Sequence, residues 1–218
     1  MNLMKRNPII KIVIYPIFIL LVCVLLFTFY PQPINNKTIT FTPISPAIVG
    51  DLPIGLPQHL FSDYLLTFSY PQHVWLGQKQ YVTLKVLPEV QLNNDDSKIY
   101  SPYSTFLEAR LDLTSMEILP GNDIFQNFQG GKSAQFLWEV NPFSDSDSEG
   151  KLWLFINVNH SDGFDLRVPV FALPIETNII SIVGLPLLIE RVLIITGLFF
   201  IVVIWVILPT SRKKKDFG

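Results

Sequence analysis

Two long apolar runs, one near each end of the chain, constrain its fold more than any other feature. Ile12–Tyr30 holds 19 residues without a charge, and Val192–Leu208 holds 17. At ~1.5 Å per residue, helices of these lengths reach ~28 and ~26 Å, close to the ~30 Å of the bilayer hydrocarbon. We therefore predict two transmembrane helices, at residues 12–30 and 186–208, with a water-facing domain between them.

The distribution of charge predicts the orientation of these helices. Lys5, Arg6 and Lys11 precede the first run, and Arg212–Lys215 follow the second. Residues 31–190 contain 8 basic and 17 acidic residues, a net charge of −9. Lys and Arg beside a span favour the cytoplasmic side. We expect an integral cell membrane protein with both termini cytoplasmic and an extracytoplasmic central domain. The lipid bilayer is then one partner, whereas nucleic acid is an unsuitable partner for so acidic a domain.

The first apolar run is predicted to be an uncleaved anchor rather than a signal peptide. It ends in Phe27–Pro31, where the small residues of a cleavage site are missing. Cys23 is the only cysteine, and we interpret it as an ordinary residue of a membrane helix. The domain between the runs has no cysteine, so it must depend on an apolar core rather than on disulfides.

A proline-rich segment follows the first run and predicts an extended stalk, with one edge strand at Thr38–Thr42. Six prolines lie between residues 31 and 57, and proline fixes φ and removes a backbone donor. The predicted organisation is a cytoplasmic tail at 1–11, a transmembrane helix at 12–30, a juxtamembrane stalk at 31–57, an extracytoplasmic β domain at 58–185, a transmembrane helix at 186–208 and a basic tail at 209–218.

The central region alternates apolar and polar residues with a period of two, which is typical of antiparallel strands with one wet face. Turn residues separate the alternating segments, and no helical stripe interrupts them. The predicted fold class is therefore an all-β ectodomain, an immunoglobulin-like antiparallel β-sandwich, flanked by two transmembrane α-helices, with Trp138 in its core. The predicted strands are Tyr64–Tyr70, Tyr81–Leu87, Phe106–Leu113, Ala134–Val140, Lys151–Asn159, Asp165–Ala172 and Ile175–Ile182.

Several of these segments carry a resemblance. Tyr70-Pro71, Gly77 and Tyr81–Val86 resemble the opening of bacterial immunoglobulin-like modules. Phe136–Pro142 followed by Gly150–Leu154 resembles the aromatic strand, proline, glycine turn and apolar strand found in such modules. The chain thus resembles uncharacterised two-pass bacterial envelope proteins with an external sandwich. The resemblance implies a fold and carries no activity or functional residue with it.

No catalytic motif is recognisable in the sequence. His59, His73 and His160 are the only histidines, and their spacing matches no H-E-x-x-H motif. The chain also lacks a G-x-S-x-G elbow, a phosphate-binding loop and a C-x-x-C pair. We expect no catalysis and no cofactor.

One acidic segment suggests a weak calcium site. Asp145, Asp147 and Glu149 alternate along the chain and precede Gly150, which matches the first half of a calcium-binding loop. The match ends there, because the bidentate carboxylate expected at position 12 is replaced by Ile156. The alternative interpretation is an acidic hairpin loop.

Two aromatic residues suggest an interaction surface. Trp153 and Phe155 alternate with Leu152, Leu154 and Ile156, so they point away from the predicted core. Either a loop or a neighbouring sheet buries them, or they form a patch that binds a partner.

The function predicted from the sequence is a membrane-anchored, non-catalytic binding or scaffold module. Its partners would be membrane or envelope proteins, and it could be a subunit of an envelope assembly. Two alternatives remain open. One is a metal-dependent sensor or enzyme with a site in the sandwich loops. The other is an accessory subunit of a channel or transporter that acts through its helices.

Overall fold

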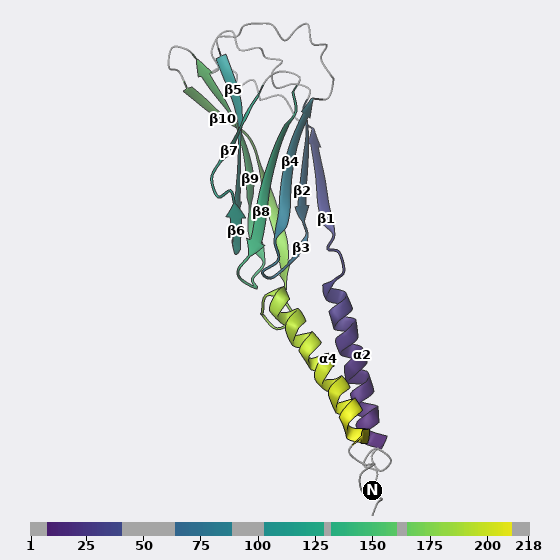
Figure 1. The fold of residues 1–218 in the computed structure, drawn as a ribbon. Helices are drawn as coiled ribbons and strands as arrows, with labels where there is room; N and C mark the ends of the chain where they lie inside the picture. The colour runs from purple at the N-terminus through teal and green to yellow at the C-terminus, as the bar shows by residue number, and fades with distance from the viewer. Residues whose placement is uncertain (1–7, 41–63, 89–102, 129–131, 161–164, 211–218) are drawn as a thin grey trace, which may run out of the picture. The chain divides into compact units, whose positions relative to one another are not determined.

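The chain folds into two compact units in the computed structural model, which describes residues 8–40, 64–88, 103–128, 132–160 and 165–210. The β unit comprises Gln32–Ile180. The helical unit comprises Met1–Pro31 and Ser181–Gly218, and it contains α2 (Pro8–Thr28) and α4 (Leu187–Thr210). Figure 1 shows the strands of the β unit and the two helices of the helical unit.

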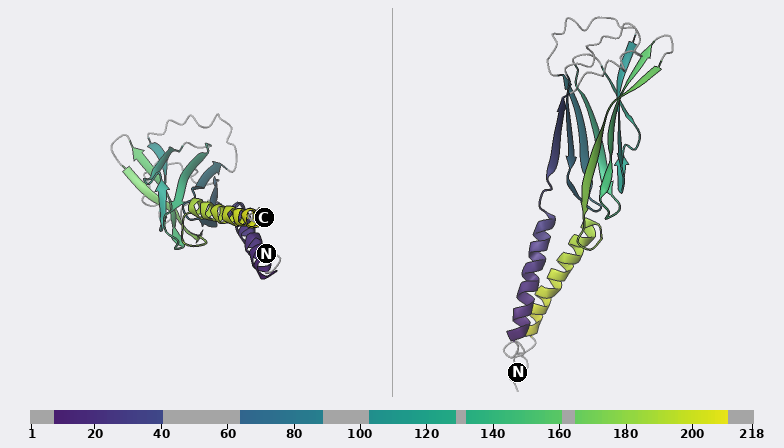
Figure 2. Two further views of the ribbon diagram at one scale, coloured as in Figure 1. Left: turned by 60° about the horizontal axis from the view of Figure 1, so that its bottom comes forward. Right: turned by 180° about the vertical axis from the view of Figure 1, so that it is seen from behind.

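The β unit consists of two five-stranded sheets (Figures 1 and 2). The first sheet contains, in spatial order, β1 (Ile34–Thr40), β2 (Tyr64–Pro71), β4 (Gln80–Pro88), β8 (Ala134–Pro142) and β6 (Met116–Leu119). The second contains β3 (His73–Trp75), β10 (Asp165–Ile180), β9 (Ser148–His160), β5 (Tyr103–Leu113) and β7 (Ile124–Asn127).

Both sheets contribute to one hydrophobic core. Strands of each sheet bury every second side chain, so that Phe136 in β8 and Leu154 in β9 are both completely buried. Trp138 is only 1% exposed, and its predicted place in the core is confirmed. The alternation read from the sequence therefore marks the core-facing positions because both sheets present one face to the same cluster.

β10 is longer than the sequence analysis expected. It joins the two predicted strands Asp165–Ala172 and Ile175–Ile182 into one strand that pairs antiparallel with β9. The register shifts between Pro169 and Phe171, which forms a bulge. Proline has no amide hydrogen, so an interruption of the ladder beside Pro169 is expected. Beyond this pairing, Asn178–Ile180 pair parallel with β3.

The segment expected to be a stalk contains a strand of the first sheet. β1 begins at Ile34 and pairs antiparallel with β2 over seven positions, from Ile34↔Pro71 to Thr40↔Leu65. The edge strand expected at Thr38–Thr42 thus begins four residues earlier. Residues 41–63 lie outside the described part of the chain.

The prediction of two transmembrane helices is wrong. Within the described residues, only Leu187–Trp205 is long and apolar enough to cross a membrane, by length and composition. The apolar part of the other helix is Val13–Thr28, ~24 Å at ~1.5 Å per residue, which is short of the ~30 Å of hydrocarbon. The helix ends at Thr28 because Phe29 and Tyr30 bond to carbonyls three residues back and Pro31 follows.

The predicted fold class is therefore corrected. The structure shows a sheet-rich unit and two helices, of which one can span a membrane, instead of an immunoglobulin-like sandwich flanked by two transmembrane helices. The sheets also differ from the all-antiparallel prediction, because the short strand β3 pairs parallel with β10.

Polar contacts organise the start of α4. Glu190 is 2% exposed, and its Oε1 accepts the amides of Ile182 (2.7 Å) and Val183 (3.0 Å) in the preceding loop. Arg191 donates to the backbone carbonyl and the hydroxyl of Thr28, and its guanidinium lies 4.1 Å from the Phe29 ring centroid. These contacts join the end of α2 to the first turn of α4.

Candidate functional site

The outer face of β9 carries the aromatic residues that the sequence analysis selected. Trp153 and Phe155 are half-buried, whereas their neighbours Leu152, Leu154 and Ile156 are at most 1% exposed on the core side. Both aromatic side chains therefore lie on the outer face of the second sheet, as their alternation implies.

Two cations stack against these rings. The Trp153 and Phe155 ring centroids are 6.2 Å apart and their planes differ by 14°. Lys151 Nζ lies 5.6 Å from the Trp153 centroid, and Arg167 Cζ lies 3.7 Å from the Phe155 centroid. We call these four residues the aromatic–cation row. Cation–π contacts at such sites contribute about 0.5–1 kcal/mol each and limit the rotamers of the rings.

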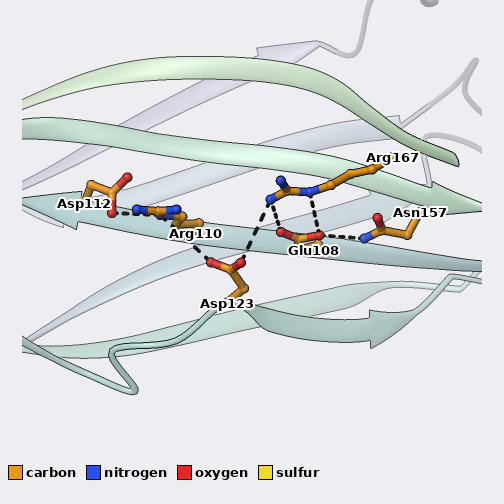
Figure 3. Close-up of polar contacts among 6 residues, drawn as sticks. All are labelled: Glu108, Arg110, Asp112, Asp123, Asn157 and Arg167. Atoms are coloured by element: carbon orange, nitrogen blue, oxygen red, sulfur yellow. Dashed lines mark hydrogen bonds and ion pairs between the residues drawn. The ribbon is translucent and has the colours of Figure 1, made fainter. Parts of the chain in front are cut away.

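A buried carboxylate lies beside the row. Glu108 of β5 is opposite Phe155 in register and is 3% exposed. Arg167 of β10 donates to both of its carboxylate oxygens, with Nε to Oε2 at 3.0 Å, and Asn157 of β9 donates to Oε2 at 2.7 Å. Figure 3 shows this arrangement. The arginine therefore binds Glu108 in bidentate fashion while it covers Phe155.

Asp123, which directly precedes β7, extends the network. Its carboxylate lies 3.9 Å from Arg167 Nη2 and 4.0 Å from Arg110 Nε, and Arg110 also pairs with Asp112 at 2.9 Å (Figure 3). We call the residues drawn in Figure 3 the Glu108 cluster: Glu108, Arg110, Asp112, Asp123, Asn157 and Arg167. The cluster connects β10, β9, β5 and the start of β7 across the outer face of one sheet.

The cluster shifts the pKa values of its two central carboxyls in opposite directions. Burial by itself raises the pKa of Glu108, but hydrogen bonds from Arg167 and Asn157 and the charge of Arg167 outweigh it, so the pKa of Glu108 is lowered. Burial raises the pKa of Asp123, the neighbouring Glu108 carboxyl raises it further, and Arg110 and Arg167 offset only part of this. At neutral pH the Glu108 carboxylate is thus the better stabilised of the two charges.

The chemistry of this face suits recognition. The carboxylates of the Glu108 cluster are paired with arginines from the same sheet, while the rings and the cations above them remain partly accessible. The residue with the most exposed apolar side chain here is Phe125 of β7, which is 59% exposed and lies opposite Glu108 in register. The row and Phe125 together offer flat apolar area with fixed cationic edges.

The predicted calcium ligands are not gathered around one point. Asp145 and Glu149 are exposed, and Asp147 Oδ1 accepts the amide of Ile179 at 3.2 Å. Glu149 is opposite Glu176 in the β9–β10 register. Within the described residues, no group of three or more His, Cys, Asp or Glu side chains is arranged to hold a metal ion. Calcium binding by Asp145, Asp147 and Glu149 stays a prediction without support from this arrangement.

The other residues considered in the sequence lie apart from the row. His73 is in β3, within 3.4 Å of Asn178 through its Nδ1, and Cys23 is exposed on α2. His160 ends β9, and His59 lies outside the described residues.

Sequence reasoning did not find the Glu108 cluster. Alternation placed Glu108 and Arg110 on the face of β5 opposite the core, which is correct, but it cannot show that Arg167 and Asn157 cover Glu108 from two other strands and bury it. The only local signal is the pair of opposite charges at Arg110 and Asp112. The long-range partners arise from the strand order, which the pattern within one strand does not determine.

Comparisons with known proteins identify no family for this chain. No protein-family model and no curated protein matches the chain. One similar solved structure is a putative ApaA protein from Bordetella pertussis, at 7% identity and a TM-score of 0.23, with 67% of this chain and 95% of that chain covered. Another is the structural genomics target SoR45, at 10% identity and a TM-score of 0.21, with 70% and 90% covered.

Proposed function

We propose that this protein is a membrane-tethered binding module that recognises a protein partner, without catalysis, through the aromatic–cation row. The observation that carries the proposal is the fixed geometry of the row, in which Trp153 and Phe155 are held on the outer sheet face by Lys151 and Arg167. Aromatic residues and arginine contribute most to protein interfaces, and rings that are already ordered lose little conformational entropy when a partner binds.

The tether in this proposal is α4. Leu187–Trp205 meets the length and hydropathy of a membrane span, and Arg212–Lys215 follow it in the sequence. Basic residues beside a span favour the cytoplasm, so we place the β unit on the extracytoplasmic side. A tether raises the effective concentration of the row near other membrane-bound proteins, which makes a membrane or envelope protein the proposed class of partner.

Site-specific photo-crosslinking in membranes of the source cell tests the binding surface. A photoreactive residue at position 125, beside the row, is expected to capture one discrete partner, and the double variant Trp153→Ala/Phe155→Ala should abolish that product. The control position is Ile34 in β1, which is similarly exposed at 64% but belongs to the other sheet. Equal capture from positions 125 and 34, or capture that persists in the double variant, would contradict the proposal.

The orientation has a separate test. Protease added to sealed cells should degrade the β unit, while carbonate washing at alkaline pH should leave the chain in the membrane. A β unit that resists protease in intact cells but is cut after lysis would place it on the cytoplasmic side and overturn this part of the proposal.

A further inference from the structure

The outer face of the first sheet carries a second patch, which the sequence analysis did not single out. In the strand register, Leu119 of β6, Glu139 of β8 and Tyr81 of β4 form one row across three strands. Leu137 lies on the same face, two residues before Glu139. We call Tyr81, Leu119, Leu137, Lys79 and Glu139 the Tyr81 patch.

The apolar members of the patch are unusually exposed. Tyr81 is 59% exposed, Leu119 52% and Leu137 47%. The core does not need them, because the residues that alternate with them, Val82, Phe136 and Val140, are at most 1% exposed on the opposite face. Contiguous exposed apolar area on a soluble domain commonly marks an interface.

The charges of the patch are balanced, unlike those of the domain. Lys79 Nζ lies 2.6 Å from Glu139 Oε1 at the centre of the patch. Lys85 and Glu117 complete the charged side chains of the outer faces of β4, β8 and β6, which makes two cations and two anions. Residues 31–190 as a whole carry a net charge of −9. Two copies of so acidic a domain repel each other over most of their surface, whereas this face is neutral.

We propose that two copies of this chain associate through the Tyr81 patch as an isologous dimer. In a two-fold interface the same surface meets itself, so the Lys79–Glu139 pair of one copy lies near that of the other, and the two pairs can exchange partners across Tyr81, Leu119 and Leu137. A second copy fits this face better than an acidic or a basic partner, because the patch offers equal numbers of both charges. The inference is independent of the binding function proposed for the aromatic–cation row, which lies on the other sheet.

Thiol crosslinking of the full chain in lipid nanodiscs and in detergent is the first test. In a Cys23→Ser background, Glu117→Cys at the rim of the patch should form a covalent dimer with a short bifunctional maleimide. Phe125→Cys is the matched control, since Phe125 is exposed like Glu117 but lies on the other sheet. Equal crosslinking from both positions, or none from position 117, would overturn the proposal.

Charge variants make the second test. Leu137→Glu adds a carboxylate beside Glu139 and should weaken the dimer by about tenfold or more, whereas Phe125→Glu should leave it unchanged. Lys79→Glu and Glu139→Lys should each weaken the dimer. An equimolar mixture of the two single variants should restore association as a mixed dimer, because opposite charges at positions 79 and 139 then meet only between the two copies. The dissociation constant is measured by sedimentation or mass photometry, with circular dichroism to check folding. A chain that is monomeric at all accessible concentrations, or a mixture of the two single variants without recovery, would contradict the dimer.

Discussion

Gly150 shows how closely two strands of the β unit approach one another. It lies in β9 opposite Leu113 of β5, and a Cβ built on it would fall 1.9 Å from the carbonyl oxygen of Asp112. The obstruction is backbone, so a side-chain rotation cannot relieve it. A residue without a side chain is therefore required at this point for space.

We predict that Gly150→Ala destabilises the β unit by about 2 kcal/mol or more, because β5 and β9 must separate locally to admit the methyl group. Chemical unfolding of the full chain in detergent, followed by tryptophan fluorescence, measures this. Gly121→Ala is the control, since its Cβ would approach Ile118 O only to 3.3 Å and should cost clearly less. Equal costs at the two glycines would show that the close approach is not rigid.

The Glu108 cluster predicts opposite effects from its two central carboxyls. The pKa of Glu108 is lowered, so its contribution to stability is present above the ordinary Glu value of ~4.3 and is lost as pH falls through the lower folded pKa. The pKa of Asp123 is raised, so its contribution is present below the ordinary Asp value of ~3.9 and is lost as pH rises through the higher folded pKa.

At pH 7 we therefore expect Glu108→Gln to destabilise the β unit by about 2 kcal/mol, since Arg167 loses its charged acceptor. Asp123→Asn should leave stability unchanged or slightly increased. Unfolding free energies from pH 3 to pH 8 measure both effects, and the Glu108 variant should lose less stability on acidification than the wild type. An Asp123→Asn variant as unstable as Glu108→Gln would show that the two carboxyls act alike.

At the scale of elements, length decided which strands could be predicted. β4, β5, β8 and β9 each repeat the apolar–polar alternation over nine or more residues, and all were predicted. β3, β6 and β7 have only three or four residues, too few for alternation to differ from chance. β3 is held by pairing with the end of β10, a contact that no local pattern contains.

α4 allows the membrane interpretation to be tested within a single helix. Ile195→Lys places a charge near the middle of Leu187–Trp205, where it should cost about 3 kcal/mol of insertion free energy. Leu188→Lys is the control, because a lysine at the end of the span can extend its ammonium to the interface at little cost. Both positions are exposed on the helix, at 52% and 74%. The measurement is the fraction of chain that resists carbonate extraction, and equal losses would argue against a spanning helix.

At the scale of the whole molecule, the pattern within one strand predicted which face of the sheet each side chain occupies. The order of the strands determined which other side chains it contacts. The outward direction of Trp153 and Phe155 follows from their alternation with buried neighbours. Arg167, which covers the Phe155 ring, lies on another strand. The Tyr81 patch forms only where three strands pair in the observed register. The number of membrane helices was overestimated for a different reason. The apolar run in the sequence continues to Tyr30, whereas the helix ends at Thr28.

The two proposed surfaces lie on different sheets, and we expect them to act independently. Residues without shared partners usually have additive effects, to within about 0.5 kcal/mol. Leu137→Glu should therefore weaken the dimer without reducing photo-crosslinking from position 125, and Trp153→Ala should do the reverse. The triple variant Leu137→Glu/Trp153→Ala/Phe155→Ala should combine the dimer loss of Leu137→Glu with the photo-crosslinking loss of the double variant Trp153→Ala/Phe155→Ala. A change in both readouts from Leu137→Glu alone would show that the faces are coupled.

The β unit is joined to an apolar helix at each of its ends. Five residues separate α2 from β1, and six separate β10 from α4. The two junctions enter different sheets. Of the two helices, only α4 contains a segment long and apolar enough to cross a membrane within the described residues. If α4 is the tether, as proposed, one proteolytic cut between β10 and α4 separates the β unit from its span, whereas a cut between α2 and β1 leaves the two covalently joined.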